Sequence, residues 1–374
     1  MAGEVGNMSS NYSIGVEEEY MLCDNAGDLS NKANLLMDVL PKKMLDRYSY
    51  ELILSEFESN TSVHTDVNEC MSEVSLLRNT INDIALKNNF RIGISGTHPT
   101  AKTNNQEFVV NNSYNWVSDQ LKYYATKNIT FSIHVHIGLD DKDKLVKVTN
   151  TLRRWIAPML ALSTNSPFFE GENTGMLSSR TFQFGLFPRT EIPTFIKSFN
   201  DYEDLINKYI ETKTISKPRQ IWWKIRPHYD YNTIEFRVCD VQRSFEKTEM
   251  IIALVQALVR TIVVNRDYDH DYCYEYLTDA LWKASSKNFS CTIIDPYDNK
   301  LISMNSMINK MIAYCKDSLN YFGNLHVLKS VEDILDNGTE ANNQIALYNE
   351  SGFKKLKKYL MNSVDYQYKR RNNV

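Results

Sequence analysis

The chain has 374 residues, of which 43% are hydrophobic and 24% charged, a composition that is typical of a folded globular protein and excludes a disordered or fibrous one. Its formal net charge of -4 gives no global attraction to nucleic acid or to an anionic membrane. The chain does not open on a basic region followed by an apolar stretch, and no run of about 18 apolar residues occurs, so we expect a cytoplasmic protein without a nucleic-acid or membrane partner.

Hydrophobic periodicity predicts both strands and helices in the first part of the chain. In chain order, the expected elements are a strand at residues 14–20, a helix at 34–47, a strand within 50–61, a helix at 66–88 and a strand at 90–95. Thr65 or Asp66 is the expected N-cap of the longer helix, because short polar side chains satisfy the free amides of a first turn.

The middle and end of the chain continue the mixed order. The expected elements are a helix at residues 114–124, a strand at 131–137, a helix at 143–164, a long loop at 165–189, a strand at 233–238, an apolar helix at 245–265 and a mainly helical remainder from about 272 to 366. Pro158 is expected to break the second of these helices, since proline removes a helical hydrogen bond. Ser244 is the expected N-cap of the apolar helix.

Three of the predicted strands carry acidic or basic side chains at every second position. Because side chains alternate between the two faces of a strand, each pair would project from one face while apolar neighbours anchor the other. The pairs are Glu17 with Glu19, His134 with His136, and Glu235 with Arg237.

Taken singly, each pair has an ordinary structural explanation, namely a solvated acidic face, a surface histidine pair or a cross-strand ion pair. Taken together with Glu51 and Glu58, they supply five carboxylates, two imidazoles and a guanidinium. Carboxylate-rich sites suit hard divalent ions such as Mg²⁺ or Mn²⁺, and a nearby arginine suits a phosphoryl group. The sequence contains no P-loop, no G-x-G-x-x-G and no kinase H-R-D motif, so nucleotide chemistry would depend on metal ions and arginines.

Seven short motifs resemble, in order and spacing, those of the glutamate–cysteine ligase type 2 group of carboxylate–amine ligases, in the glutamine synthetase-like superfamily. They are G-V-E-E-E-Y at residues 15–20, E-x6-E-x-x-T at 51–61, H-V-H-I-G at 134–138, N-S-P-F at 165–168, T-G-x4-R at 174–180, W-K-I-R-P-H at 223–228 and I-E-F-R-V-C-D at 234–240. The resemblance spans about residues 12–360, nearly the whole chain.

The resemblance implies an α+β fold in which a curved, mainly antiparallel sheet forms a funnel backed by helices. It implies one ligase domain over residues 1–374, with a sheet-containing core at 12–265 and a mainly helical C-terminal portion at 270–366. The apolar stripes of the C-terminal helices are compatible with a homo-oligomer.

The resemblance also implies a set of site residues. Arg237 would contact phosphate and act in catalysis with Glu235 and His136, and His136 would lie near phosphate. Arg226 and Arg180 would bind phosphate or a substrate carboxylate. The implied metal ligands are Glu17, Glu19, Glu51, Glu58, His134 and Glu235.

The implied activity is ATP- and Mg²⁺-dependent joining of a carboxylate to an amine, with release of ADP and phosphate. By resemblance the acid is glutamate, activated at its side chain as an acyl phosphate, and the amine is cysteine or another amino compound. Two alternatives remain at this point: a metal-dependent hydrolase or phosphotransferase, and a non-catalytic binding protein of the same fold.

Several features depart from the pattern or have plain explanations. Where the family commonly shows an N-R-W-x-A helix, residues 279–284 are D-A-L-W-K-A, and Lys287 replaces a following arginine, so substrate choice can differ here. The basic segment 354–358 is expected to be a solvated helix face. Cys239, Trp222 and Trp223 are expected to pack in the interior, and all six cysteines to be reduced thiols.

Overall fold

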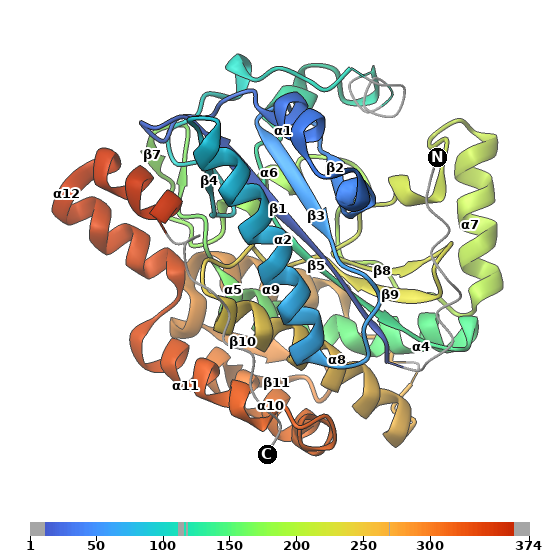
Figure 1. Ribbon diagram of the computed structural model, residues 1–374. Helices are drawn as coiled ribbons and strands as arrows, with labels where there is room; N and C mark the ends of the chain where they lie inside the picture. Colours follow the sequence, from blue (N-terminus) through green and yellow to red (C-terminus); the bar gives the residue numbers. More distant parts are fainter. Residues whose placement is uncertain (1–11, 111–115, 117–118, 269, 363–374) are drawn as a thin grey trace.

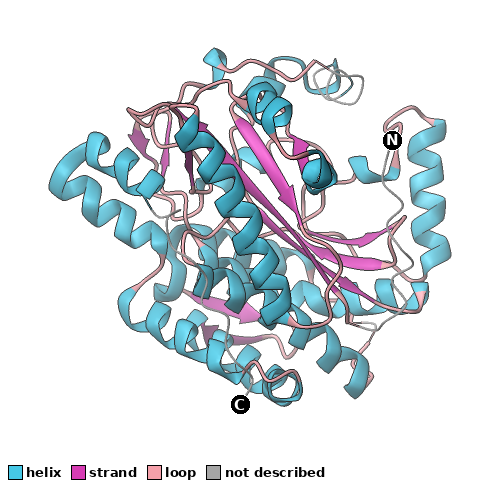
Figure 2. Cartoon of the chain, in the orientation of Figure 1, coloured by secondary structure: helices cyan, strands magenta, loops and turns pink. Residues whose placement is uncertain are grey.

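The computed structural model describes residues 12–110, 116, 119–268 and 270–362, and an antiparallel seven-stranded sheet lies at its centre (Figures 1 and 2). The strand order is β2-β3-β1-β5-β9-β8, and β4 pairs with the end of β1. The strands of this sheet are β1 (Ile14–Cys23), β2 (Tyr48–Tyr50), β3 (Glu56–Asn60), β4 (Arg91–Gly93), β5 (Ile133–Gly138), β8 (Ile225–His228) and β9 (Thr233–Phe236).

Helices surround the sheet, and two small hairpins lie apart from it. The helices are α1 (Ala33–Val39), α2 (Val67–Lys87), α4 (Lys142–Leu152), α5 (Ile156–Ser163), α6 (Ser179–Gly185), α7 (Phe199–Glu211), α8 (Phe245–Asn265), α9 (Tyr274–Lys287), α10 (Met304–Tyr321), α11 (Leu328–Asn337) and α12 (Glu340–Asn362), the last interrupted at Gly352. The hairpins are β6 (Phe168–Phe169) with β7 (Glu172–Asn173), and β10 (Thr292–Asp295) with β11 (Lys300–Ser303).

The apolar side chains of the sheet form its packed face. Val16, Ile133, Val135 and Phe236 are buried in one cluster with residues of α2 and α8, and α2 crosses the strands in Figure 1. By length and composition α8 is apolar enough to cross a membrane, but 78% of its apolar window is buried inside the protein. A core helix of a globular protein has the same length and composition. The face of the sheet that points away from α2 and α8 is polar and is left open for a site.

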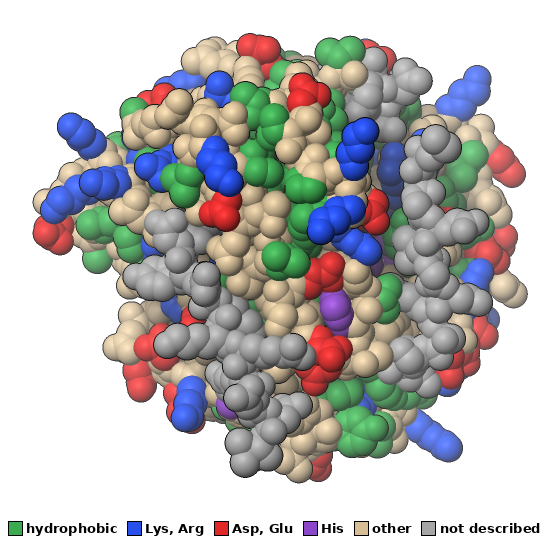
Figure 3. Space-filling model, in the orientation of Figure 1, with side chains coloured by type: hydrophobic (Ala, Val, Ile, Leu, Met, Phe, Trp, Pro, Cys, Tyr) green, Lys and Arg blue, Asp and Glu red, His purple; other side chains and the backbone are tan. Residues whose placement is uncertain are grey.

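Most expected elements are present. The cap of α2 is confirmed at Asp66, which accepts from the Glu69 amide at 2.9 Å. The cap of α8 is confirmed at Ser244, which accepts from the Lys247 amide at 3.2 Å. The strand expected within 50–61 is confirmed as β3, and the strand before Gly96 as β4. Lysines 354, 355 and 358 are exposed on α12, as expected, and basic side chains mark that side of the molecule in Figure 3.

Two expected helices differ from the structure. The helix at 34–47 ends at Val39, because the residue before Pro41 is driven out of the helical region, and a 3₁₀ turn (Lys42–Arg47) follows. The helix at 143–164 breaks at a 3₁₀ turn (Arg153–Trp155), not at Pro158. Pro158 instead lies in the first turn of α5, where no amide is required.

The loop at 165–189 contains the helix α6, capped by Ser178, which accepts from the Thr181 amide. Residues 114, 115, 117 and 118 of the expected helix at 114–124 lie outside the described residues, and a 3₁₀ turn (Lys122–Lys127) covers its end.

Candidate active site

The polar face of the sheet gathers the side chains that alternation predicted. Strands β3, β1, β5, β9 and β8 lie side by side, so residues far apart in the sequence become cross-strand neighbours. The register pairs Glu19 with Glu58, Glu17 with His134, His136 with Glu235, and Glu235 with Arg226.

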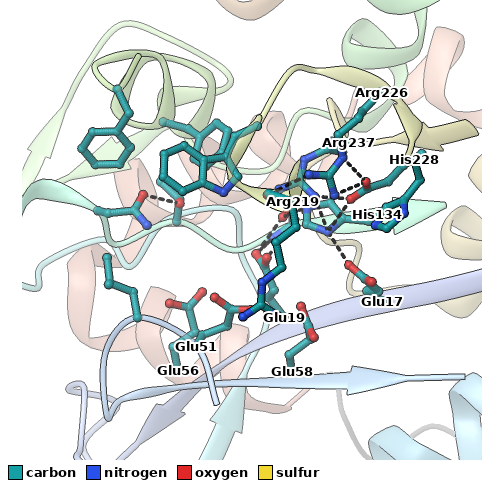
Figure 4. A pocket seen from close by; sticks show the side chains of 18 of the residues that line it. Glu17, Glu19, Glu51, Glu56, Glu58, His134, Arg219, Arg226, His228 and Arg237 are labelled. Atoms are coloured by element: carbon teal, nitrogen blue, oxygen red, sulfur yellow. Dashed lines mark hydrogen bonds and ion pairs between the residues drawn. The ribbon is translucent and has the colours of Figure 1, made fainter. Parts of the chain in front are cut away.

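These side chains border a cavity of about 290 Å³. In Figure 4 the carboxylates of Glu51, Glu56 and Glu58 gather at one end, and Arg226 and Arg237 lie at the other. The cavity is lined by Glu17, Glu19, Glu51, Leu52, Glu56, Glu58, Leu121, Asn128, Thr130, Ser132, His134, Phe184, Phe187, Arg219, Trp222, Arg226, His228, Tyr231, Glu235 and Arg237.

The acidic end of the cavity crowds like charges together. Burial, followed by the charges of Glu17 and Glu19, raises the pKa of Glu58 to about 8. Burial and Glu58 raise the pKa of Glu51, and burial and Glu19 raise that of Glu56, well above the ordinary value. Carboxylates held so close to one another require protons or a cation to neutralise them.

Neutral donors fix the orientation of two of these acids. Glu58 Oε1 accepts from Ser49 Oγ at 2.7 Å and from Asn60 Nδ2 at 2.9 Å. Glu19 Oε2 accepts from the Ser132 amide at 2.5 Å and from Ser132 Oγ at 2.7 Å. The carboxylates are therefore held in place by groups that carry no compensating charge.

The centre of the face is occupied by Glu17 and two histidines. His134 Nδ1 lies 2.8 Å and His136 Nε2 3.3 Å from the Glu17 carboxylate. Burial alone would raise the pKa of Glu17, but the contacts with both imidazoles outweigh burial and hold it well below its usual range. Glu17 is thus ionised at neutral pH.

The basic end is organised around Glu235. Arg226 Nε donates to Glu235 Oε2 at 2.6 Å, and Arg237 forms an ion pair with Oε1. Burial would raise the pKa of Glu235, but the two guanidinium groups outweigh it and hold that pKa well below its usual range. Glu235 is therefore a fixed anion between two fixed cations.

The donor set fits divalent metal ions. In three groups of residues, candidate ligand atoms lie within 4.8 Å of one another. The groups are Glu19, Glu51 and Glu58; Glu17, Glu58 and His134; and Glu17, His136 and Glu235. Each is dominated by carboxylate oxygen, which Mg²⁺ and Mn²⁺ prefer, and the raised carboxyl pKa values show where positive charge is lacking.

Two of the expected site residues do not line the cavity. Arg180 is 4% exposed, and its guanidinium donates to the carbonyl oxygens of Arg237 at 2.9 Å and Val238 at 3.0 Å. It therefore supports the chain after β9 and does not face the cavity in this conformation. His136 lies behind Glu17 and Glu235, with Nδ1 3.0 Å from Thr233 Oγ1.

Sequence reasoning gave no site role to several lining residues, among them Glu56, His228, Arg219 and Tyr231. Glu56 and His228 each follow strand parity, two positions from Glu58 and Arg226, and that signal could have found them. Arg219 and Tyr231 lie outside the strands, and no periodicity marks them. 

The residues that were expected to pack in the interior do so only in part. Trp223 and Cys239 are 9% and 1% exposed in apolar clusters, which confirms the prediction, but Trp222 lines the cavity.

The segment that departs from the family pattern, residues 279–284, lies on α9. None of its residues lines this cavity among those the structure describes. Asp279 forms an ion pair with Lys283 at 2.7 Å. The differences in this segment therefore lie outside the carboxylate-lined face of the cavity.

Comparisons with known proteins agree with this geometry. A family model described as glutamate–cysteine ligase family 2 matches residues 13–358. A protein of Solibacter usitatus, provisionally named glutamate–cysteine ligase 2, is 30% identical over 366 residues, which cover 95% of this chain and 94% of that protein.

Two solved structures share the fold. The glutamate–cysteine ligase of Francisella tularensis in complex with AMP has a TM-score of 0.74 at 14% identity, over 96% of this chain and 89% of that one. The bifunctional glutathione synthetase of Pasteurella multocida has a TM-score of 0.67 at 12% identity, over 95% of this chain and 53% of that one. The expected α+β fold class is confirmed.

Proposed function

Because the chain belongs to glutamate–cysteine ligase family 2, and is therefore an ATP-dependent carboxylate–amine ligase, we propose that the cavity on the polar face of the sheet is its active site. The observation that carries the proposal is the arrangement of Glu235 between Arg226 and Arg237, next to the carboxylate groups that fit divalent ions. We further propose that Mg²⁺ or Mn²⁺, ATP and a glutamate-like acid bind there.

The reaction requires an activated acid. A carboxylate does not react with an amine directly, because its charge repels the nucleophile and oxide is a poor leaving group. In the proposed first step a carboxylate oxygen of the acid attacks the γ-phosphorus of ATP, the bond to ADP breaks, and an acyl phosphate forms. In the second step the deprotonated amine attacks the carbonyl carbon, and the C–O bond to phosphate breaks.

The residues at the basic end are suited to the transferred phosphoryl group. Arg237 and Arg226 carry planar, permanently charged donors, and their ion pairs with Glu235 fix them in the cavity wall. We assign phosphate contact to both, and the electrostatic part of catalysis to Arg237 with Glu235. His136 then keeps Glu17 and Glu235 in position from behind.

The metal ligands proposed here are Glu17, Glu19, Glu51, Glu58, His134 and Glu235. When bound, the metal ions neutralise the charge of the polyphosphate. The protein's own contribution is to hold the oxygens in place through Ser49, Asn60 and Ser132.

ADP release tests the proposal. A ligase needs ATP, Mg²⁺, an acid and an amine together, so ADP formation should depend on both organic substrates, which a screen of glutamate with cysteine and other amines can identify from product mass. ADP that appears equally fast without an amine would favour a hydrolase and contradict the ligase mechanism. Absence of any turnover over the whole screen would favour a binding protein.

Two variants test the site within the same assay. Arg237→Ala should lower kcat by at least about 100-fold, because it removes positive charge that faces the reacting phosphate. Glu235→Gln should lower it as much, because the carboxylate holds both arginines in place and belongs to the proposed metal ligands. Glu350→Gln, an exposed position on α12, is the matched control and should keep full activity. Full activity of either site variant would show that the site is assigned wrongly.

A further inference from the structure

A second cavity lies on the other side of α6 from the proposed active site. It encloses about 280 Å³ and is bordered by α6, α9 and the loop after α6. Its wall is mainly apolar: Phe182 and Trp282 meet edge to face with ring centroids 4.7 Å apart, and Leu281 is buried beside them. Trp282 is 54% and Leu186 55% exposed, so the cavity opens to solvent through apolar side chains.

One buried cation borders this apolar cavity. Lys224, immediately before β8, is 8% exposed and is the one basic residue among the described residues of the wall. No described residue lies within hydrogen-bond or ion-pair distance of its Nζ. Glu191 is the only acid among the described lining residues, and it does not reach Nζ.

Charged side chains of both signs lie near Lys224. Arg180 of α6 and Arg237 after β9 disfavour its ammonium form, whereas Glu191 and Asp240 favour it. Burial, followed by Arg180, lowers the pKa of Lys224 to about 7. Asp240 is already engaged by Asn165, Ser166 and Ser178 and cannot turn to the lysine. The amine therefore lacks a counter-ion, and an anionic ligand in the cavity can supply one.

We propose that this cavity is a second small-molecule site, and that it binds a monocarboxylate with an apolar body of about eight to twelve heavy atoms. The carboxylate pairs with Lys224, and the apolar body lies against Phe182, Leu281 and Trp282. A phosphate ester is disfavoured, because one lysine in an apolar wall offers too few donors for a dianion.

The site is separate from the active site and does not rest on the proposed function. Thr181, Phe182 and Gly185 of α6 face this cavity, whereas Phe184 lines the other one. The two cavities therefore share a helix but no lining residue among those described. A ligand of the second site can bind while the first is occupied.

Calorimetric titration with 3-phenylpropionate, and with the uncharged 3-phenylpropan-1-ol, tests the proposal on the full chain at neutral pH. We expect Lys224→Met to weaken the acid at least about tenfold and to change the affinity for the alcohol less than about twofold. Thr278→Trp, which fills the cavity from α9, should abolish binding of both. Asp279→Asn, exposed on the same helix, is the control and should bind both normally.

Two further measurements make the outcome decisive. Arg237→Ala should keep binding of the acid or strengthen it, because the Arg237 charge disfavours the ammonium form of Lys224. Loss of binding would place the acid in the active-site cavity and overturn the proposal. In the unmutated protein, affinity for the acid should rise as the pH falls from about 8.5 to about 6, because the lysine must be protonated to pair with the ligand. Equal affinity of Lys224→Met and the unmutated protein, a pH-independent affinity, or no binding at about 10 mM ligand would each overturn the proposal.

Discussion

Three consecutive glutamates of β1 have different environments because a strand turns successive side chains to opposite faces. Glu17 and Glu19 face the active-site cavity. Glu18 points into the packing between the sheet and α2, where its Oε1 lies 2.6 Å from Arg78 Nη2. The Tyr20 hydroxyl donates to the other oxygen at 2.6 Å, and both members of the ion pair are about fully buried. Adjacent acids of the same type therefore have separate places, two at the proposed metal site and one in a buried ion pair.

This difference predicts opposite effects of two neighbouring substitutions. Glu18→Gln should destabilise the protein by about 3 kcal/mol, because it leaves the Arg78 charge buried without a counter-ion. Glu17→Gln should leave the metal-free protein folded and abolish Mg²⁺-dependent turnover. Urea unfolding and the ADP assay measure the two effects. A Glu18→Gln protein that is as stable as the unmutated one would contradict the structural role of this ion pair.

At the scale of elements, Asp240 joins the end of the sheet to the loops that carry the N-S-P-F and T-G-x4-R motifs. Its carboxylate accepts from the Asn165 amide at 2.8 Å, from Ser166 Oγ at 2.7 Å and from Ser178 Oγ at 3.0 Å. Gly96 packs directly on this group, and a Cβ there would lie 2.7 Å from Asp240 Cγ. The junction tolerates no side chain at position 96.

We therefore expect Gly96→Ala to destabilise the protein by about 1–3 kcal/mol, because Asp240 or the backbone must move to admit the methyl group. Turnover should fall as well, since Asp240 and Ser166 hold the start of α6 next to the cavity. Gly185→Ala is the matched control for stability: no atom lies within 4 Å of its added Cβ, and its φ is not positive. Equal melting temperatures of the two variants would contradict this account.

The arrangement of the site strands could be predicted from the sequence, whereas some contacts between elements could not. The site strands and their polar face follow from alternation, a property of the local chain, so Glu17, His134 and Glu235 could be placed together. Arg180 could not be placed, because its partners are backbone carbonyls more than 50 residues away. The break near Pro158 was misplaced because proline is tolerated in a first turn, and only tertiary packing decides where that turn begins.

At the scale of the whole molecule, the helical C-terminal portion shares its core with the sheet. Met307 of α10 and Val331 of α11 belong to the same buried cluster as Val16 of β1. Leu360 of α12 belongs to the cluster that contains Tyr20 and Phe57. The two largest apolar clusters therefore each draw residues from both ends of the chain.

We infer that residues 12–362 unfold as one cooperative unit. Differential scanning calorimetry should give a single transition whose calorimetric and van't Hoff enthalpies agree. A chain that ends at residue 268 should fail to reach a native near-ultraviolet spectrum, because it leaves one side of both clusters exposed. Two resolved transitions, or a folded and active truncated chain, would show that the two portions are independent domains.

A cytoplasmic location and a homo-oligomer stay predictions.

We expect the acidic end of the proposed active site to make the stability of the protein depend on pH and on metal together. In the metal-free protein the pKa of Glu58 is raised to about 8, and those of Glu51 and Glu56 are also raised. The folded state therefore keeps protons that the unfolded chain releases near its ordinary carboxyl pKa. Stability should fall as the pH rises through this window, by up to about 1.4 kcal/mol per pH unit for each proton held.

Mg²⁺ should reverse this fall, because it replaces the protons as the positive charge among the carboxylates. The rise in melting temperature on adding Mg²⁺ should accordingly be larger at about pH 8 than at about pH 6, where the ion must first displace protons. Glu58→Gln should raise the melting temperature of the metal-free protein at the higher pH and reduce the response to Mg²⁺. Glu350→Gln should leave both values unchanged, since it lies on an exposed face of α12. A response to Mg²⁺ that is the same at both pH values would mean that these carboxylates do not bind the ion, and the metal site would have to be sought elsewhere.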